Sequence, residues 1–261
     1  TPVATKTTRK TTRKVTWCDS DSDSDRAPVA PVKAIRIGFS DMWPGFNVDS
    51  NFIMDALRHE DPSRVFRGVH WSSGIEAHLL IAGPFGTSWK DSSLPIVFFT
   101  AESAPSPDDH RIRLHLTSSP KEDETHMRIP TWMTFIDWYT DSTVLPADSQ
   151  DNPIRLPVYF ATHSHPISFE ARTGFCAFVV SNPTCAMRNE AFHALHAYRP
   201  VTSGGGLFNN IGGPLALKYP GGGSGDLSKH HFFSQHRFSL SFENAQVDGY
   251  ITEKVLHAKM A

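Results

Sequence analysis

The sequence has few cysteines and no long apolar run, and its net charge is close to zero. Cys18, Cys176 and Cys185 are the three cysteines among 261 residues. At least one therefore stays unpaired within the chain, and no disulfide framework or cysteine-based zinc site is indicated, which mildly favours a reducing compartment. No run approaches the roughly 18 apolar residues that a membrane-spanning helix needs, so we expect no membrane segment within this chain. The formal net charge of −2 argues against general binding to nucleic acid.

A dedicated metal site is not indicated either, although the chain contains 14 histidines. The pairs His163-Ser-His165 and His230-His231 are not joined by a His-Glu-x-x-His motif or a comparable ligand spacing. Asp-x-Asp pairs occur at 19–25, but they lie in a segment of opposite charge runs with almost no apolar residues. Such a composition is typical of disorder, so residues 1–32 are predicted to be a disordered charged tail or linker.

The next part of the chain has the pattern of an α/β domain. Residues 35–39 and 112–116 alternate apolar with other residues, whereas 78–82 and 96–99 are compact apolar runs. Apolar runs separated by helix-length segments indicate parallel strands. The interval 141–168 is rich in Pro, Asp and Ser and is a candidate domain boundary. We therefore predict an N-terminal α/β domain over 33–165.

A second α/β domain is predicted over 170–261. It opens with an apolar strand at 175–180, and a helix follows in which Ala191, Ala194, Leu195 and Tyr198 share one face. A further helix is expected at 228–236.

The densest stretch lies at 238–254. Phe238, Leu240 and Phe242 alternate with serines as in a half-buried strand. Gly249 allows a turn, and Thr252 is placed to cap a helix that begins near Glu253. Helix N-termini that follow strands in α/β sheets attract phosphate and ribose groups. The pattern alone favours an ordinary capped helix with solvated charges.

The particular residues of this stretch are more specific than its pattern. Phe242-Glu-Asn244 and Gly249-Tyr-Ile-Thr-Glu-Lys254 resemble the signature of the α-1,3-fucosyltransferases, glycosyltransferase family 10. Further stretches fit the same family in the same order, namely 82–86, 99–103, 127–130, 181–183, 187–189 and 200–206. The resemblance covers roughly residues 34–261 and is weak between about 131 and 172.

This resemblance implies a GT-B-type architecture, in which two Rossmann-like α/β domains face a cleft. Members of the family continue past the place that corresponds to Ala261. We therefore expect the second domain to be incomplete here and the chain to be a C-terminally truncated fragment.

The resemblance also implies a catalytic base. Glu102 follows the apolar strand 96–99, at the carboxyl end where α/β folds place their ligands. A carboxylate there can deprotonate an acceptor hydroxyl if partial burial raises its pKa. Ala104 stands where the usual family pattern has a further acidic residue. The alternative for Glu102 is an exposed loop glutamate.

Five residues are implied as donor ligands. Arg188 and Lys254 would stabilise the diphosphate, and Glu253 would accept hydrogen bonds from the ribose hydroxyls. Tyr250 would contact the nucleotide, and Asn244 would bind the sugar or phosphate. Plain capping or packing is the alternative for Asn244, Tyr250, Glu253 and Lys254, and a surface charge is the alternative for Arg188. Trp43 and Trp132 lie near predicted strand or loop ends, where sugar rings could stack on them, although packing is the simpler role.

The implied function is inverting transfer of L-fucose from GDP-fucose to a hydroxyl of a glycan acceptor, by resemblance O3 of N-acetylglucosamine. The acceptor would occupy the first domain. No cofactor is required, and a divalent metal is compatible with the reaction but not indicated. A related transferase that uses another nucleotide sugar, and a non-catalytic glycan-binding relative, remain alternatives. The family resemblance implies a Golgi membrane enzyme with a luminal domain if the source is eukaryotic, and a cytoplasmic one if it is bacterial or viral.

Overall fold

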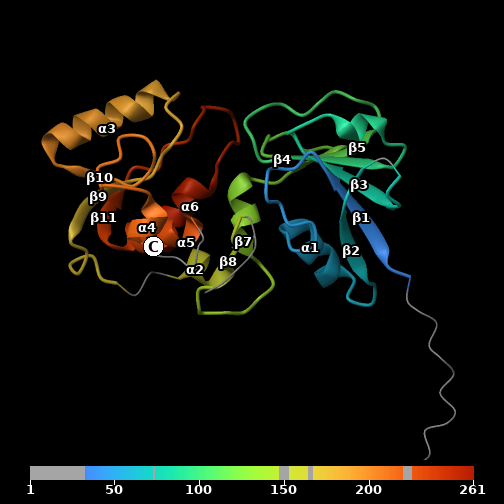
Figure 1. Ribbon diagram of the computed structural model, residues 1–261, viewed down its shortest axis with the longest axis horizontal. Helices are drawn as coiled ribbons and strands as arrows, with labels where there is room; N and C mark the ends of the chain where they lie inside the picture. Colours follow the sequence, from blue (N-terminus) through green and yellow to red (C-terminus); the bar gives the residue numbers. More distant parts are fainter. Residues whose placement is uncertain (1–32, 73, 147–152, 164–166, 220–224) are drawn as a thin grey trace, which may run out of the picture. The chain divides into compact units, whose positions relative to one another are not determined.

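The computed structural model describes residues 33–72, 74–146, 153–163, 167–219 and 225–261 (Figure 1). The predicted tail at 1–32, with Cys18 and the Asp-x-Asp run, lies outside the described residues. The described part is an α/β structure in which every pairing between named strands is parallel.

The first sheet has six strands in the order β2-β1-β3-β4-β5-β6. The strands are β1 (Ile35–Ser40), β2 (Phe66–His70), β3 (Leu79–Ala82), β4 (Ile96–Thr100), β5 (Ile112–Thr117) and β6 (His126–Arg128). The four strands predicted from apolar patterns are confirmed. The strand order reverses between β1 and β3, which is the position where open α/β sheets bind ligands.

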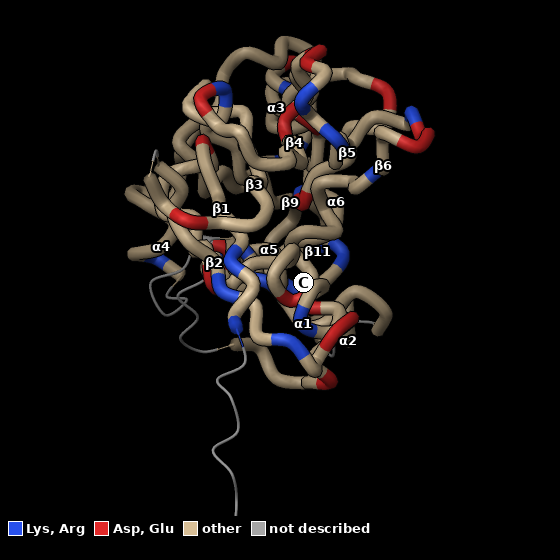
Figure 2. Tube along the Cα trace, turned by 90° about the vertical axis from the view of Figure 1, so that its right-hand side faces the viewer, with Lys and Arg blue, Asp and Glu red and all other residues tan. Residues whose placement is uncertain are grey.

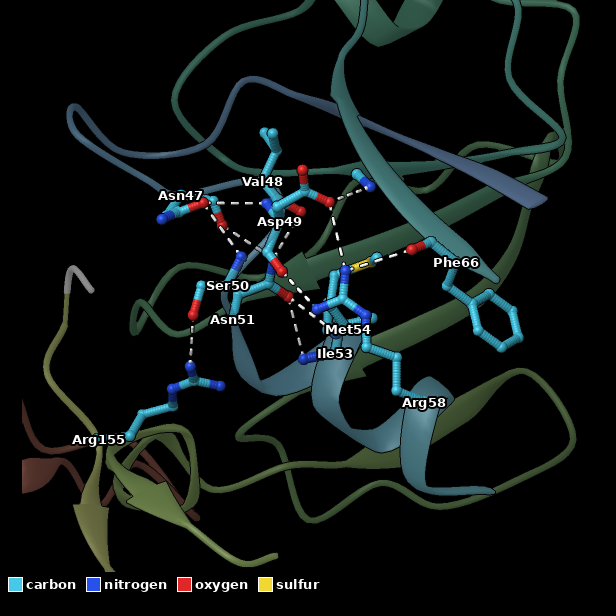
Figure 3. Close-up of polar contacts among 11 residues, drawn as sticks. Asn47, Val48, Asp49, Ser50, Asn51, Ile53, Met54, Arg58, Phe66 and Arg155 are labelled. Carbon is cyan, nitrogen blue, oxygen red and sulfur yellow. Dashed lines mark hydrogen bonds and ion pairs between the residues drawn. The ribbon is translucent and has the colours of Figure 1, made fainter. Parts of the chain in front are cut away.

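Helix α1 (Phe52–Glu60) and the loop before it pack against this sheet. Asn51 caps the helix, since its Oδ1 accepts hydrogen bonds from the N–H groups of Ile53 and Met54 (Figure 3). Arg58 donates to the carbonyl and carboxylate of Asp49, which ties the end of the helix back to the loop. These bonds fix the loop that follows β1 at one end of the sheet.

The segment between the two larger sheets has its own short elements. They are the 3₁₀ helix η2 (Thr131–Phe135), the strands β7 (Ile136–Asp137) and β8 (Leu156–Pro157), and the helix α2 (Val158–Thr162). Ile154 and Leu156 are buried in a cluster with Leu227 and Met260. The predicted boundary region therefore shares a core with the C-terminal helices, and the position of a domain boundary stays a prediction.

The second sheet has three strands in the order β10-β9-β11. The strands are β9 (Gly174–Phe178), β10 (Val201–Ser203) and β11 (His236–Ser239), and the helices are α3 (Ala186–Tyr198), α4 (Leu215–Lys218), α5 (Gly225–Ser234) and α6 (Glu253–Met260). Phe192 of α3 packs on Phe178 and Val201 of the sheet.

Two predicted elements are displaced along the chain. The strand expected at 238–242 occupies His236–Ser239, and Phe238 is 53% exposed. The helix expected at 228–236 begins at Gly225 and ends at Ser234. The reason is that β11 pairs with β9 from His236 onward, so the chain must leave the helix before that residue. Tertiary pairing thus decided the boundary that the local pattern left open.

The predicted face of α3 is only partly right, since Leu195 packs against the core cluster but Ala194 and Tyr198 are exposed. The buried positions are Arg188 and Phe192, whereas Tyr198 is 83% exposed. An arginine on the inward face breaks the apolar periodicity that the prediction followed.

Candidate active site

A cleft of about 360 Å³ gathers residues from both parts of the described chain. One wall comes from the loops that follow β1, β3 and β4 and from η2, and the other comes from α5, the 244–252 loop and the start of α6. The polar residues that line it are Glu102, Thr131, Thr134, Asp226, Lys229, Asn244, Tyr250, Thr252, Glu253 and Lys254. Five of the six predicted site residues therefore line one cleft.

Glu102 lies just past the end of β4, as predicted. Its backbone N–H donates to Thr100 Oγ1 at 3.1 Å, and its side chain also borders a second hollow of about 450 Å³ with Ser118, Lys121 and Asp248. The condition of partial burial is not met, because Glu102 is exposed, as in the alternative of a loop glutamate. The chain turns into a surface loop directly after the strand, so the carboxylate stands between two hollows.

Tyr250 is buried, with 7% of its surface exposed. Burial is the main cause that raises the pKa of its phenol to about 12, and the carboxylates of Glu102, Glu243 and Glu253 contribute in the same direction. The hydroxyl therefore stays protonated near neutral pH and can donate a hydrogen bond to an oxygen of a ligand.

Glu243 organises the start of α6. Its carboxylate accepts hydrogen bonds from Thr252 N–H at 2.7 Å and from Thr252 Oγ1–H at 2.6 Å. Thr252 is the residue before the helix, as predicted, but its side chain makes no cap bond to the helix. The hydroxyl instead donates to Glu243, which the sequence did not single out as a site residue. An acidic group near a helix N-terminus is favourable because of the helix dipole.

Glu253 and Lys254 occupy the first turn of α6. Lys254 Nζ lies 3.3 Å from Glu243 Oε2 and 3.6 Å from Glu253 Oε1, and it donates to Thr252 Oγ1 at 2.9 Å. The side chains of both residues are less than one fifth exposed. The lysine is therefore held at the cleft between two carboxylates.

Arg188 is fully buried. It does not line the cleft itself but contacts a residue that does. It donates from Nη1 to Asn244 Oδ1 at 2.6 Å and from Nη2 to the carbonyl of Asn182. Its Nε is buried without a hydrogen-bond partner among the described residues. The arginine thus orients the Asn244 amide, and Asn244 lines the cleft.

Two cleft residues were missed by the sequence analysis. Asp226 and Lys229 stand three residues apart on α5 and form an ion pair at 2.9 Å. Burial raises the pKa of Asp226, but Lys229 and His257 outweigh that effect and the net shift is downward. Burial lowers the pKa of Lys229, but the carboxylate of Asp226 raises it more, so the net shift is upward. The i,i+3 spacing of the two charges is visible in the sequence, but such pairs are common on solvated helices, so the spacing does not indicate burial.

Among the described residues, no group of three or more His, Cys, Asp or Glu side chains is arranged to hold a metal ion. The described helices also include none that is long and apolar enough to cross a membrane. Cys176 is buried and Cys185 is partly buried, and both are free thiols. Burial raises the pKa of the Cys176 thiol to about 11, so this residue acts as an apolar core group.

Comparison with known proteins extends these observations. The model of the glycosyltransferase family 10 (fucosyltransferase) C-terminal region matches residues 169–261. The α-(1,3)-fucosyltransferase FucT of Helicobacter pylori is 27% identical over 208 residues, which cover 73% of this chain and 41% of the relative. The chain thus spans about two fifths of the length of that relative.

Solved structures of α1,3-fucosyltransferases share the fold. One without a named ligand has a TM-score of 0.58 at 23% identity, and the match covers 90% of this chain and 68% of the chain in that structure. One described as a GDP-fucose complex has a TM-score of 0.57 at 20% identity, and the match covers 91% of this chain and 69% of the chain in that structure. The fold is therefore of the GT-B type that these enzymes have, as expected. The resemblance of this chain to the family 10 fucosyltransferases is confirmed, most directly over residues 169–261.

Proposed function

We propose that this chain carries the active-site cleft of an inverting fucosyltransferase that transfers L-fucose from GDP-fucose to a hydroxyl of a glycan, with O3 of N-acetylglucosamine as the acceptor atom. The observation that carries the proposal is that Glu102 lines one cleft together with Asn244, Tyr250, Glu253 and Lys254. The similarity of residues 169–261 to the family model supports the donor assignment.

Glu102 takes the role of base in this proposal. It removes the proton of the acceptor hydroxyl as that oxygen attacks the anomeric carbon of the donor, and the bond from that carbon to the diphosphate oxygen breaks. An exposed carboxylate between two hollows can reach a sugar in either of them. Attack from the face opposite the leaving group inverts the anomeric centre.

The donor occupies the α5–α6 wall. Lys254 and the N–H groups at the start of α6 stabilise the negative charge that develops on the leaving GDP. Arg188 contributes through Asn244, whose amide it orients. Glu253 accepts hydrogen bonds from the ribose hydroxyls, and Tyr250 donates one to the nucleotide.

A two-part experiment tests this proposal. GDP-fucose, GDP-mannose, UDP-xylose and UDP-galactose are titrated in turn, and transfer from each to N-acetyllactosamine is measured. We expect GDP-fucose to bind and turn over, and Glu102→Gln to lower kcat by about 10²–10⁴-fold while GDP still binds. Glu60→Gln, at an exposed glutamate at the end of α1, is the matched control. Binding of a UDP-sugar in place of GDP-fucose would overturn the donor assignment, and full activity in Glu102→Gln would overturn the base.

A further inference from the structure

The loops that follow three neighbouring strands form the wall of the cleft that contains Glu102. Strands β1, β3 and β4 are adjacent and parallel, so their carboxyl ends meet at one edge. The loops after them contribute Trp43, Phe85 and Glu102 to the cleft. Phe85 is 53% exposed, which is a large apolar surface to leave in water beside a polar cleft.

Phe85 is held in this exposed position by Asp41. The carbonyl of Asp41 accepts the N–H of Phe85 at 2.9 Å, and its carboxylate accepts the N–H of Ser88 at 3.3 Å and of Trp89 at 3.1 Å. Asp41 has a φ of 56°, a left-handed conformation that few residues other than Gly, Asn and Asp adopt. Backbone strain of this kind persists where surrounding contacts enforce it, and it is concentrated at functional sites.

Two further contacts make the loop rigid. The N–H of Gly83 donates to the carbonyl of Ser40 at 2.8 Å, and a Cβ on Gly86 would collide with the Asp41 carboxylate. Trp43, on the same wall, packs edge-on against Phe46 with ring centroids 4.7 Å apart. The backbone that carries Phe85 and the ring of Trp43 are therefore both held by contacts within the first part of the chain.

We propose that Phe85, together with Trp43, is the surface on which the pyranose ring of the acceptor stacks, and that Asp41 is a positioning residue for Phe85. This inference rests on the proposed function. A pyranose has one face of C–H groups that packs on an aromatic ring, while its hydroxyls reach polar groups at the rim. The acceptor is the occupant because Phe85, like Glu102, follows a strand of the first sheet, whereas the cleft residues suited to a nucleotide come from α6 and the loop before it.

The test separates acceptor binding from donor binding. Phe85→Ala is expected to raise the KM for N-acetyllactosamine about tenfold, while the Kd of GDP-fucose, titrated without acceptor, changes less than about twofold. Phe85→Trp is expected to keep the acceptor KM near the wild-type value. Asp41→Ala is expected to raise the acceptor KM in the same way with a smaller change in kcat. Tyr198→Ala, which removes an exposed aromatic ring on α3, is the control.

Saturation-transfer NMR with N-acetyllactosamine reports acceptor contact without turnover. We expect signal on ring C–H protons with the wild type and loss of it with Phe85→Ala. If the wild type binds GDP-fucose but Phe85→Ala leaves the acceptor KM and the NMR signal unchanged, the acceptor surface is wrong and the proposed function stands. If Phe85→Ala raises the Kd of GDP-fucose instead, Phe85 belongs to the donor. If the wild type does not bind GDP-fucose, the proposed function itself fails.

Discussion

Arg188 is a fully buried cation whose partners are neutral. Both of its hydrogen bonds go to amide oxygens, and among the described residues no carboxylate forms an ion pair with it. Burying an unpaired charge is costly, so a ligand anion close to Asn244 would lower the energy of this arrangement. Under the proposed function, such an anion would account for the buried arginine on the inward face of α3.

Arg188→Lys tests this role. The substitution keeps the charge but loses the fork that binds Asn244 and the Asn182 carbonyl together. We expect the free energy of unfolding to fall by about 1–3 kcal/mol and the affinity for GDP to fall at least tenfold. Urea denaturation and GDP titration measure the two effects. Arg113→Lys, at an exposed arginine of β5, is the control, and equal behaviour of the two variants would contradict the assignment.

The Asp226–Lys229 pair makes a second prediction at this scale. Lys229→Met leaves the Asp226 carboxylate without its nearest cation. Because the side chains are still 17% and 30% exposed, we expect a loss of about 1–3 kcal/mol, less than for a fully buried pair. Asp226→Asn combined with Lys229→Met is expected to recover part of that loss, as measured by urea denaturation. If the double variant is no more stable than Lys229→Met alone, the unpaired Asp226 carboxylate is not the cause of the lost stability.

Among single residues, sequence reasoning found those that a specific motif contains and missed those that only burial defines. Glu102, Asn244, Tyr250, Glu253 and Lys254 line the cleft, and all stand in stretches that resemble the family. Glu243 stands in the same motif but was not assigned a role, because its part depends on a turn that brings it back to Thr252, nine residues later. No local pattern states that distance, so that part of the site was not predictable.

The loop before α6 lies in close contact with the first part of the chain. Gly249 has a φ of 79°, and a Cβ there would collide with the carbonyl oxygen of Ser118 and press on Pro120. The turn predicted at Gly249 is confirmed, but its second function is the close approach to the loop after β5. Trp132 N–H also donates to Ile251 O, at 3.4 Å, so the start of α6 is held against the first part of the chain.

Gly249→Ala measures the importance of that approach. The left-handed φ alone costs about 1–2 kcal/mol, and the collision adds a backbone shift. Gly212→Ala is the matched control, since Gly212 has a φ of 75° with open space around it. We expect Gly249→Ala to be the less stable variant in thermal unfolding and to bind GDP more weakly. Equal stability of the two variants would show that the contact with Ser118 is unimportant.

At the level of elements, strongly apolar strands were predictable and short polar ones were not. The runs that became β3 and β4 are continuous and buried, whereas β2 reads FRGVH and β6 reads HMR. Both of these lie at the edges of the sheet, where polar residues reach water and no apolar pattern is needed. Their place is set by pairing with β1 and β5, which sequence periodicity does not show.

For the whole molecule, buried histidines predict how stability depends on pH. Burial lowers the pKa of His115, His236 and His257 below 6.5, and these residues lie in β5, β11 and α6. Each stays neutral in the folded state, while the unfolded state takes up protons below about pH 6.5. The resulting stability is fully present above that pH and is lost as the pH falls toward the lower folded values.

Urea midpoints at pH 7.5 and pH 5.5 check this expectation. We expect a lower midpoint at pH 5.5, and a smaller difference between the two pH values in His257→Leu. His110→Gln, whose side chain is 93% exposed, is expected to keep the wild-type difference. A midpoint that is the same at both pH values would contradict the prediction.

The carboxylate of Glu243 has a consequence for how any anion enters the cleft. Lys254 is already between two carboxylates, and Lys229 is already paired with Asp226, so these cations are neutralised before a ligand arrives. Lys and Arg are likewise interspersed with Asp and Glu along the described trace (Figure 2), and the net charge is near zero. Binding of a diphosphate is therefore an exchange of partners at Lys254 rather than the neutralisation of bare charge. Its affinity is expected to depend only weakly on ionic strength, and more strongly in Glu243→Gln, where the lysine has lost one of its internal anions.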